Sequence, residues 1–515
     1  MRRFLPILSI LFIAIMARCE SNSRYAYSNA EMVSLLGLKK FLVTDLNVYV
    51  TMLQENLNAV ELAIKQIEIE VQQLEENHIE KEFNGIRQFS FMRHLHSDWP
   101  QWLRFMRQEV ALEWQNHVQE IRPYLPTKVD LDEACKAIYI LIEIYGLSVD
   151  DFSRGLINGK QYKSKSFDAM DCFALARNGF EKRYFDRAEA WFEAIWLTDD
   201  NAELHRVMGF DLAHVLQLYA RNLFNLDKKE LALQMLQETL TLGTDDQRVL
   251  RQLKLMERGD LKPTKLETEG KTLEFERYFQ GCRGLFDPPQ GLSCHYDFNT
   301  HPVLRLAPLK VEPLNRDPYV AIYHDVIYDS EIEELKRHAL PDLKRSKVYN
   351  LVLQGEKSDS ARTSTSSFQT DHQNKAVTAV NRRVMHMTGF EVEKIGSSDK
   401  LLIINYGTGG QYMPHRDYFG PKYNKYIERG DRIATALFYL NDVEQGGKTV
   451  FPYLEISCTP IKGSALVFHS MNSSYHGEAR SLHGGCPVLV GSKWAATKWI
   501  YNAEQMFQWP CVKTN

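Results

Sequence analysis

The stretch between residues 401 and 494 constrains the fold of this chain more than any other feature. It begins with Leu401–Tyr406, an apolar and β-branched run that predicts a buried strand. His415 and Asp417 follow shortly afterwards, and residues two apart on an extended chain project from the same face. His483 comes late enough to return on another strand of a barrel. We therefore expect these three side chains to meet.

Two imidazoles and one carboxylate on one side of a metal ion leave its opposite positions open. Non-haem Fe(II) oxygenases use this arrangement to bind O2 together with a co-substrate. Lys493 follows the strand-like run Pro487–Val490, and a lysine ammonium inside a pocket needs an anion to pair with. The alternative is coincidence, since an isolated His-x-Asp is common. The distal histidine and the lysine together favour a metal site.

The region from about Asp317 to Cys511 resembles the catalytic domain of the collagen prolyl 4-hydroxylase α subunit. The matching segments are Asn405–Tyr412, His415–Asp417, Arg432–Leu440, Gly446–Pro452 and His483–Trp494. The resemblance implies the double-stranded β-helix, a jelly roll, of 2-oxoglutarate dioxygenases. Many short predicted strands separated by glycine turns agree with that fold class.

The resemblance also implies the roles of the candidate site residues. His415, Asp417 and His483 are expected to hold Fe(II), and Lys493 is expected to pair with the distal carboxylate of 2-oxoglutarate. L-Ascorbate is the implied reductant. The implied reaction is that of a procollagen-proline 4-dioxygenase, which hydroxylates peptidyl proline in X-Pro-Gly sequences with O2 and releases succinate and CO2.

Further residues are carried over from the resemblance as neighbours of the two substrates. Tyr406 and Thr449 stand where the family places polar neighbours of the co-substrate. Arg362, Phe368 and Trp494 are candidate contacts of the peptide. The family usually has tryptophan at the position of Phe368, in a loop expected to cover the peptide, so an indole donor is missing here.

Two other functions stay open at this point. The first is the same chemistry on secreted proline-rich proteins other than collagen. The second is a non-catalytic luminal scaffold with an inactive dioxygenase fold. The intact set of candidate ligands, together with Lys493, favours an enzyme.

The first residues predict a secretory signal peptide over residues 1–19. Two arginines precede the apolar run Phe4–Met16, and Ala17-Arg-Cys19 offers a cleavage site. The run is too short to span a membrane comfortably, and no later stretch qualifies. The formal net charge of −4 gives no nucleic-acid footprint. We expect the endoplasmic reticulum lumen as the location.

The last residues, Val512–Asn515, are not a luminal retention signal. A luminal protein of this kind therefore needs a retained partner. The resemblance implies protein disulfide isomerase in that role, as the β subunit.

A secretory context makes the cysteines candidates for disulfides. Cys282 and Cys294 enclose a short loop, and Cys486 and Cys511 flank the end of the catalytic domain. Both pairs are credible disulfides, and the resemblance supports the same pairings. Buried free thiols are expected at Cys135, Cys172 and Cys458.

Residues 20–150 are expected to form a helical dimerisation region. Nine apolar residues alternate spacings of four and three, which is the pattern of a left-handed coiled coil. A helix packed on its own domain is the alternative, and the strict alternation favours a partner helix. The resemblance implies self-association within an α2β2 tetramer. The seam consists of Leu46, Val50, Leu53, Leu57, Val60, Ile64, Ile67, Val71 and Leu74.

Residues 160–257 carry a degenerate repeat typical of tetratricopeptide helices. Ala232 and Leu236 repeat the pairing of Ala188 and Phe192, at an offset longer than the standard period. This offset implies a longer turn within or between the repeats. Stacked helix pairs of this kind form a concave face.

Aromatic residues of the repeat could line that face and bind a proline-rich strand. A polyproline II segment is already ordered and loses little entropy on binding to such a groove. The candidates are Tyr184, Phe185, Trp191 and Tyr219. The alternative is that these rings pack inside the repeat. The resemblance places the peptide-substrate-binding domain here.

The remaining residues divide into a linker and the catalytic domain. Residues 258–316 are expected to be a disulfide-containing linker, because proline and glycine punctuate them. Within residues 317–515, strands are predicted at 319–324, 401–406, 433–440, 465–468, 488–490 and 494–500, and helices at 329–339 and 375–388.

Overall fold

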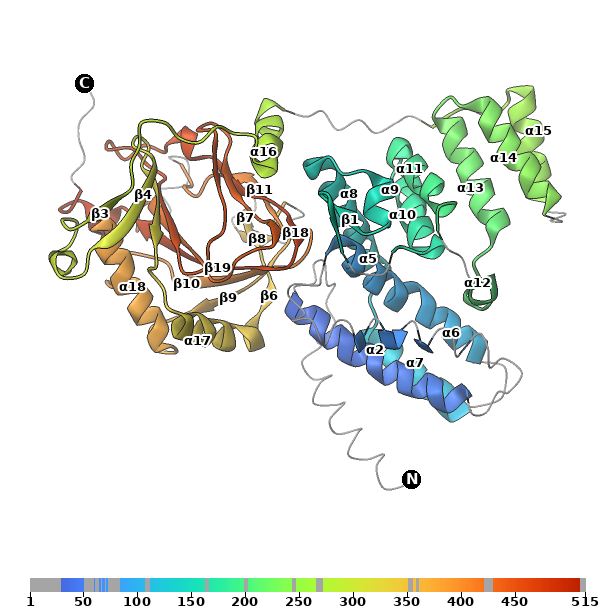
Figure 1. Cartoon of the computed structure of the whole chain (residues 1–515), viewed down its shortest axis with the longest axis horizontal. Coiled ribbons are helices and arrows are strands. Elements are labelled where there is room, and N and C mark those ends of the chain that lie inside the picture. The colour runs from blue at the N-terminus through green and yellow to red at the C-terminus, as the bar shows by residue number, and fades with distance from the viewer. Residues whose placement is uncertain are drawn as a thin grey trace. The chain divides into compact units, whose positions relative to one another are not determined.

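The chain divides into two compact units, of which Glu31–Gly270 is helical and Lys271–Asn515 is built on β-sheets (Figure 1). The predicted signal peptide and Cys511 lie outside the described residues. No helix in the described part of the chain is long and apolar enough to cross a membrane. The computed structural model describes residues 29–50, 60, 64–65, 67–69, 71–72, 84–106, 112–162, 166–198, 202–242, 247–264, 272–350, 355–357, 361–420 and 429–509.

The helical unit is interrupted around Pro123 and Pro126, because proline ends a helix. Helix α7 ends at Ile121 and α8 begins at Lys128, and the side chains of Thr127 and Asp130 form a capping box at the start of α8. The elements are α2 (Asn29–Val50), α5 (Gly85–Arg93), η2 (His94–Asp98), α6 (Trp99–Met106), α7 (Leu112–Ile121), η3 (Arg122–Tyr124), α8 (Lys128–Tyr145), α9 (Val149–Ser153), β1 (Leu156–Ile157), β2 (Lys160–Gln161), α10 (Ala169–Glu181), α11 (Phe185–Ile195), α12 (Ala202–Met208), α13 (Leu212–Asn225), α14 (Lys229–Thr241) and α15 (Gln247–Arg258).

Part of the proposed coiled-coil seam packs inside this single chain. Leu46, Val60, Ile64 and Val71 are buried within this single chain. Leu53, Leu57 and Leu74 lie outside the described residues. Packing on its own domain, the alternative considered above, therefore accounts for the four buried residues, whereas Val50 and Ile67 are only half-buried. Pairing of two chains through it stays a prediction.

The two-helix repeat is present as the pairs α10–α11 and α13–α14. The small and large residues that predicted it, Ala188 with Phe192 and Ala232 with Leu236, are all fully buried. Helix α12 stands between the two pairs in the sequence, which explains the long offset. Gly179 lets α10 and α11 approach closely, because a Cβ there would lie only 3.1 Å from the Cβ of Ala188.

The sheet unit consists of antiparallel strands, and all six strands and both helices predicted for it are confirmed to within one residue at each end. Its helices are α16 (Leu273–Arg283), α17 (Asp329–Ala339), α18 (Lys375–Thr388) and the short η4 (Pro302–Arg305), η5 (Leu340–Asp342), η6 (Ala479–Ser481) and η7 (Ala503–Gln505). Its strands are β3 (His295–Asp297), β4 (Leu309–Asn315), β5 (Val320–His324), β6 (Lys344–Arg345), β7 (Val348–Asn350), β8 (Gly355–Lys357), β9 (Thr365–Gln369), β10 (Leu401–Tyr406), β11 (Tyr412–His415), β12 (Arg432–Tyr439), β13 (Gln445–Gly446), β14 (Thr449–Phe451), β15 (Ile456–Cys458), β16 (Ala465–His469), β17 (His483–Gly485), β18 (Val488–Val490) and β19 (Lys493–Tyr501).

Two of the sheets form the jelly roll predicted from the sequence. The larger has nine strands in the order β3-β4-β5-β16-β12-β19-β10-β9-β6, and the smaller has the order β11-β17-β14-β15. One core lies between the nine-stranded sheet and helices α17 and α18, and includes Ile332, Val377 and Ile403. A second core, including Phe451 and Phe468, joins the two sheets on the other face.

The segment expected to be a linker contributes to this unit. Strands β3 and β4 extend the edge of the nine-stranded sheet, and α16 contacts the four-stranded sheet. The predicted disulfide pairings are wrong, because Cys282 is bonded to Cys486 and Cys294 is free and exposed. The bond to Cys282 leaves Cys486 unable to pair with Cys511. Cys135, Cys172 and Cys458 are buried and form no disulfide, as predicted.

We predict that Gly179→Val lowers the free energy of unfolding of the helical unit by about 1–3 kcal/mol, because overpacking forces α10 and α11 apart. Gly37→Ala is the matched control. Nothing lies within 4 Å of a Cβ at Gly37 in α2, so this change should add about 0.5–1 kcal/mol. Urea unfolding of the full chain, followed by far-UV circular dichroism, measures both. A wild-type midpoint for Gly179→Val would contradict the close helix contact.

Candidate metal centre

The three predicted metal ligands meet between the two sheets. Strands β11 and β17 pair antiparallel, with His415 directly opposite His483. Asp417 follows β11 and approaches both rings, with Oδ1 3.6 Å from Nε2 of His415 and Oδ2 3.8 Å from Nε2 of His483. One potential ligand atom from each residue lies within 4.8 Å of the others. The sequence prediction that these side chains converge is confirmed.

Hydrogen bonds fix the orientation of all three candidate ligands. Nδ1 of His415 donates to the carbonyl of Met413 at 2.9 Å, and Nδ1 of His483 donates to that of Ser481 at 3.0 Å. Because carbonyls only accept, both Nδ1 atoms carry hydrogen, and Nε2 is the ring nitrogen that each histidine turns toward Asp417. The hydroxyl of Thr435 donates to Oδ2 of Asp417 at 2.6 Å.

The protonation states suit a divalent cation. Burial raises the pKa of the Asp417 carboxyl, but His483, His415 and Arg432 lower it more, so the pKa lies well below its usual value. Burial and the nearby His415 lower the pKa of His483 to about 4. At neutral pH the cluster therefore offers an ionised carboxylate and a neutral imidazole, the forms that bind metal.

Lys493 is a buried cation without a carboxylate partner among the described residues. Its ammonium donates to the carbonyl of Gly447 at 2.7 Å and lies 3.4 Å from Oγ1 of Thr449. The rings of Tyr406 and Tyr439 lie nearby, with the ammonium 5.9 and 5.3 Å from their centroids. Burial lowers the pKa of Lys493 to about 7. Such a group is stabilised by an incoming anion.

One cavity joins the cluster to Lys493. Its lining includes all three candidate ligands, Lys493 and the predicted neighbours Tyr406, Thr449 and Arg362. The hydroxyl of Tyr439 donates to Thr449 at 2.9 Å and orients it. The structure thus brings together the residues predicted for the metal and for the co-substrate.

Tyr412, Thr435 and Trp499 are among the lining residues that escaped the sequence prediction. Tyr412 stacks on the ring of His415 with centroids 3.5 Å apart, and Thr435 holds Asp417. Trp499 lies six residues after Lys493 on β19, so strand alternation places both on one face. Its indole Nε1 is buried without a hydrogen-bond partner. The signal for Trp499 was its even spacing from Lys493.

The same alternation makes the prediction for Trp494 wrong. Trp494 is next to Lys493 on β19 and therefore faces the opposite side of the sheet, where it is buried in the core with α17 and α18. Phe368 of β9 pairs with Leu402, whose side chain packs with Ile404 and Tyr406. Phe368 is thus on the cavity side of the sheet, and 51% of it is exposed.

The aromatic residues predicted to line a peptide groove mostly pack inside the repeat. Phe185 and Trp191 are almost fully buried, and Tyr219 stacks on Phe192 with ring centroids 5.0 Å apart. Tyr184 is half-buried, and its ring lies 4.8 Å from the guanidinium of Arg187. Internal packing, the alternative considered above, holds for three of these rings.

A different cavity, of about 350 Å³, lies in the helical unit. It is lined by residues of α8, α10 and the start of α13, including Phe173, Phe210 and His214. The ring of Phe173 meets those of Phe210 and His214 edge to face, both at 5.9 Å. Sequence reasoning missed this cluster because it chose Tyr184, Phe185, Trp191 and Tyr219 as the groove residues instead.

A second group of potential metal ligands, in the helical unit, is already neutralised. His94, Asp168 and Asp171 lie close together, but the Arg93 guanidinium pairs with Asp171 and lies 3.5 Å from Asp168. A guanidinium in this place competes with any cation. The cluster instead joins α5 to the start of α10.

Parts of both units match known protein families. Residues 28–159 match the N-terminal region of the prolyl 4-hydroxylase alpha-subunit, and residues 401–501 match the 2OG-Fe(II) oxygenase superfamily. Prolyl 4-hydroxylase subunit alpha-1 of Homo sapiens is 29% identical over 514 residues, covering 94% of this chain and 95% of its own length. Subunit alpha-1 of Gallus gallus is 30% identical over 451 residues, covering 82% and 86%.

A third relative and one solved structure complete the comparison. Prolyl 4-hydroxylase subunit alpha-3 of Homo sapiens is 29% identical over 469 residues, covering 83% of this chain and 84% of its own. The viral collagen prolyl hydroxylase of Paramecium Bursaria Chlorella virus-1, solved with 2OG, is 21% identical and covers 35% of this chain and 94% of that one. The TM-score of this match is 0.29.

We predict a pH-dependent stability that Lys493 creates in the metal-free protein. Between its folded pKa of about 7 and the ordinary 10.5, the unfolded chain binds one more proton than the folded chain. Stability contributed by this residue should therefore rise with pH, by at most about 1.4 kcal/mol per pH unit. Between pH 7 and about 10, the wild type should gain stability relative to Lys493→Met.

Urea unfolding followed by tryptophan fluorescence at several pH values measures this difference. The control is Lys400→Met at an exposed position, whose difference from the wild type should be the same at every pH. A constant difference for Lys493→Met as well would show that Lys493 does not carry an unpaired buried charge.

Proposed function

Because the chain belongs to the family of prolyl 4-hydroxylase α subunits, we propose that it hydroxylates proline in collagen-like peptides with X-Pro-Gly sequences. It is a 2-oxoglutarate-dependent Fe(II) dioxygenase. The observation that carries the proposal is the single cavity that holds two histidines and an aspartate together with a buried, unpaired lysine.

The cluster fits Fe(II) by the chemistry of its donors. His415 and His483 turn their Nε2 atoms to the centre and Asp417 presents an ionised carboxylate, a set typical of iron oxygenases. Bound Fe(II) and 2-oxoglutarate supply the oxidative chemistry, in which O2 is consumed, the co-substrate becomes succinate and CO2, and a proline C–H bond is hydroxylated. Thr435 and the carbonyls behind each ring keep the donors in place.

Lys493 fits the distal carboxylate of 2-oxoglutarate. Its ammonium is fixed by the Gly447 carbonyl before any ligand arrives, so little side-chain freedom is lost on binding. The hydroxyls of Thr449 and Tyr406 lie in the same cavity as additional polar contacts. An anion there keeps Lys493 charged, which its burial otherwise disfavours.

We predict that Lys493→Ala raises the KM for 2-oxoglutarate by about 10–100-fold, because a buried charge-assisted pair is lost. Lys493→Arg keeps the charge but changes its reach and should also raise this KM. Release of succinate, driven by a Pro-Pro-Gly repeat peptide, is the measurement. Lys498→Met is the matched control. Lys498 is also buried on β19, but strand alternation places its side chain on the opposite face of the sheet from Lys493. An unchanged KM for Lys493→Ala would overturn the assignment.

We propose that the cavity of the helical unit receives another part of the peptide. The cluster of Phe173, Phe210 and His214 offers ring faces and edges to proline rings, and a polyproline II strand needs no reordering to reach it. This proposal replaces the groove expected at Tyr184, Phe185 and Tyr219.

Phe173→Ala and Phe210→Ala should each raise the KM for a long Pro-Pro-Gly peptide by about 3–10-fold, the loss expected for an aromatic contact. Neither change should alter the KM for 2-oxoglutarate. Trp196→Ala is the control, because Trp196 is an exposed ring that does not line the cavity. Equal effects of all three variants would count against the groove.

The remaining features of the proposal rest on the family alone. L-Ascorbate is proposed as the reductant that keeps the iron in its active state. The endoplasmic reticulum lumen is proposed as the location, protein disulfide isomerase as the β subunit, and an α2β2 tetramer as the assembly. Co-purification of the two subunits from a secretory expression host tests the partner.

A further inference from the structure

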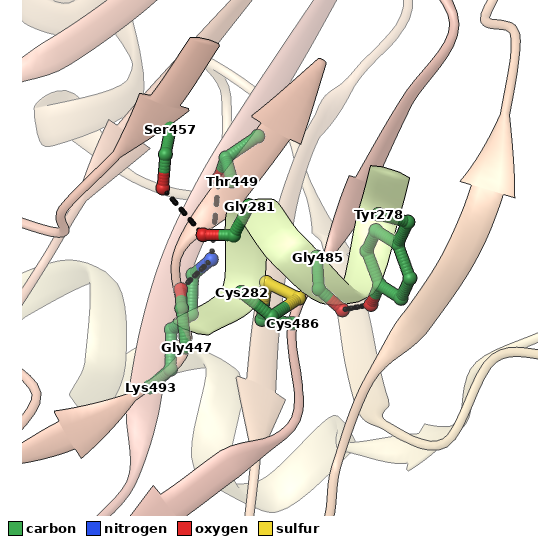
Figure 2. The surroundings of a disulfide bond; sticks show 9 residues. All are labelled: Tyr278, Gly281, Cys282, Gly447, Thr449, Ser457, Gly485, Cys486 and Lys493. Carbon is green, nitrogen blue, oxygen red and sulfur yellow. Dashed lines mark hydrogen bonds between the residues drawn. A yellow bond between two sulfur atoms is a disulfide. The ribbon is translucent and has the colours of Figure 1, made fainter. Parts of the chain in front are cut away.

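Helix α16 is fastened to the strands that carry the candidate metal centre (Figure 2). The disulfide between Cys282 and Cys486 ties its last turn to the end of β17. The hydroxyl of Tyr278, one turn earlier, donates to the carbonyl of Gly485 at 2.9 Å. From β15, the Ser457 hydroxyl donates to the carbonyl of Gly281, also at 2.9 Å. A covalent bond and two hydrogen bonds thus hold one face of this helix.

The helix is seated directly on the strands, with no room between them. A Cβ at Gly281 would lie 2.4 Å from a methyl carbon of Val450 in β14. A Cβ at Gly484 would lie 2.8 Å from the ring of Tyr278. Both contacts are shorter than packed atoms allow, so glycine is required on each side of the interface.

The fastened strand segment is part of the metal site. Gly485 lines the cavity and lies two residues after His483 on β17. Within the four-stranded sheet, Gly485 pairs with Thr449 on one side and with Tyr412 on the other. A shift of the Gly485 carbonyl therefore moves His483 and the ring stacked on His415 together.

The fastening also reaches Lys493 through the backbone around Gly447. The amide of Cys486 donates to the carbonyl of Lys448 at 2.8 Å, and the amide of Gly447 donates to the carbonyl of Pro487 at 3.0 Å. The carbonyl of Gly447 is the acceptor that holds the ammonium of Lys493. In Figure 2 the disulfide lies between Gly447 with Lys493 on one side and Tyr278 with Gly485 on the other.

We propose that α16 is a positioning brace, in which the Cys282–Cys486 bond and the Tyr278 hydroxyl hold both the histidine strand and the lysine anchor in register. Neither Tyr278 nor the two cysteines line the cavity. Their effect is transmitted through Gly485 and through Gly447. The inference rests on the proposed function, and it adds that a disulfide outside the cavity sets the affinity for metal and 2-oxoglutarate.

The pairing itself is tested first, by mass spectrometry of the non-reduced protein after proteolysis. A linked peptide containing Cys282 and Cys486 is expected. Linked peptides joining Cys282 to Cys294, or Cys486 to Cys511, would overturn the brace without any reference to catalysis.

The second test measures binding of Mn(II) to the metal-free full-length protein by electron paramagnetic resonance, with and without 2-oxoglutarate. Tyr278→Phe keeps the ring and removes one hydrogen bond, so its affinity for 2-oxoglutarate should fall about 3–10-fold. The double variant Cys282→Ser/Cys486→Ser should lose about 10-fold or more for both Mn(II) and 2-oxoglutarate, while Cys294→Ser should match the wild type.

Reduction provides an independent route to the same state. An excess of a small dithiol converts Cys282 and Cys486 to thiols, while the dithiol is oxidised to its cyclic disulfide. The wild type should then bind Mn(II) like the double variant, and the double variant should be insensitive to the reagent. Unchanged circular dichroism distinguishes positioning from loss of fold.

The outcomes separate this inference from the proposed function. Wild-type affinities for Tyr278→Phe and for the reduced protein would overturn the brace and leave the oxygenase assignment standing. A wild type that binds Mn(II) but never releases succinate with any proline peptide would overturn the function, and the binding measurements would still decide on the brace.

Discussion

The antiparallel pairing of β11 with β17 is the constraint on which the site depends. It sets His415 directly opposite His483, which lies 68 positions later in the sequence, and so brings the two imidazoles to one point. Asp417 reaches the pair only because the chain leaves β11 immediately after His415. Hydrogen bonds with Thr435 and with the carbonyls of Met413 and Ser481 then orient the three candidate metal ligands.

The nine-stranded sheet supplies the other half of the site through strand alternation. On β19, Lys493 and Trp499 face the cavity, whereas Trp494 faces the helices α17 and α18. Placing a lysine on the inner face of a strand is costly unless an anion joins it. At Lys493 burial lowers the pKa of the ammonium, and no carboxylate among the described residues pairs with it. The co-substrate completes what the protein alone leaves unpaired.

Local patterns in the sequence predicted much of this arrangement. Apolar runs gave the strands β10 and β18 and the helices α17 and α18 with their bounds, because period and punctuation are local properties. The metal and co-substrate residues followed from spacing and from family resemblance. Trp494 was misplaced because the resemblance was carried over without applying the alternation that Lys493 already implied.

Long-range choices could not be read in the same way. Cys282 had several possible partners, and its bond to Cys486, 204 positions away, depends on where α16 docks. Strand β4 was hidden in a segment rich in proline and glycine, since its role as a sheet edge is decided by its neighbour β5. The aromatic cluster at Phe173 forms only when α10 and the start of α13 come together.

The uneven burial of the cluster gives the site a front and a back. The His415 side chain is 18% exposed, against 8% for His483 and 5% for Asp417. His415 is therefore the candidate ligand that solvent reaches most readily, beside the ring of Tyr412 that stacks on it. Exchange of a bound ion is expected to begin at His415, while the layers that bury His483 and Asp417 stay packed.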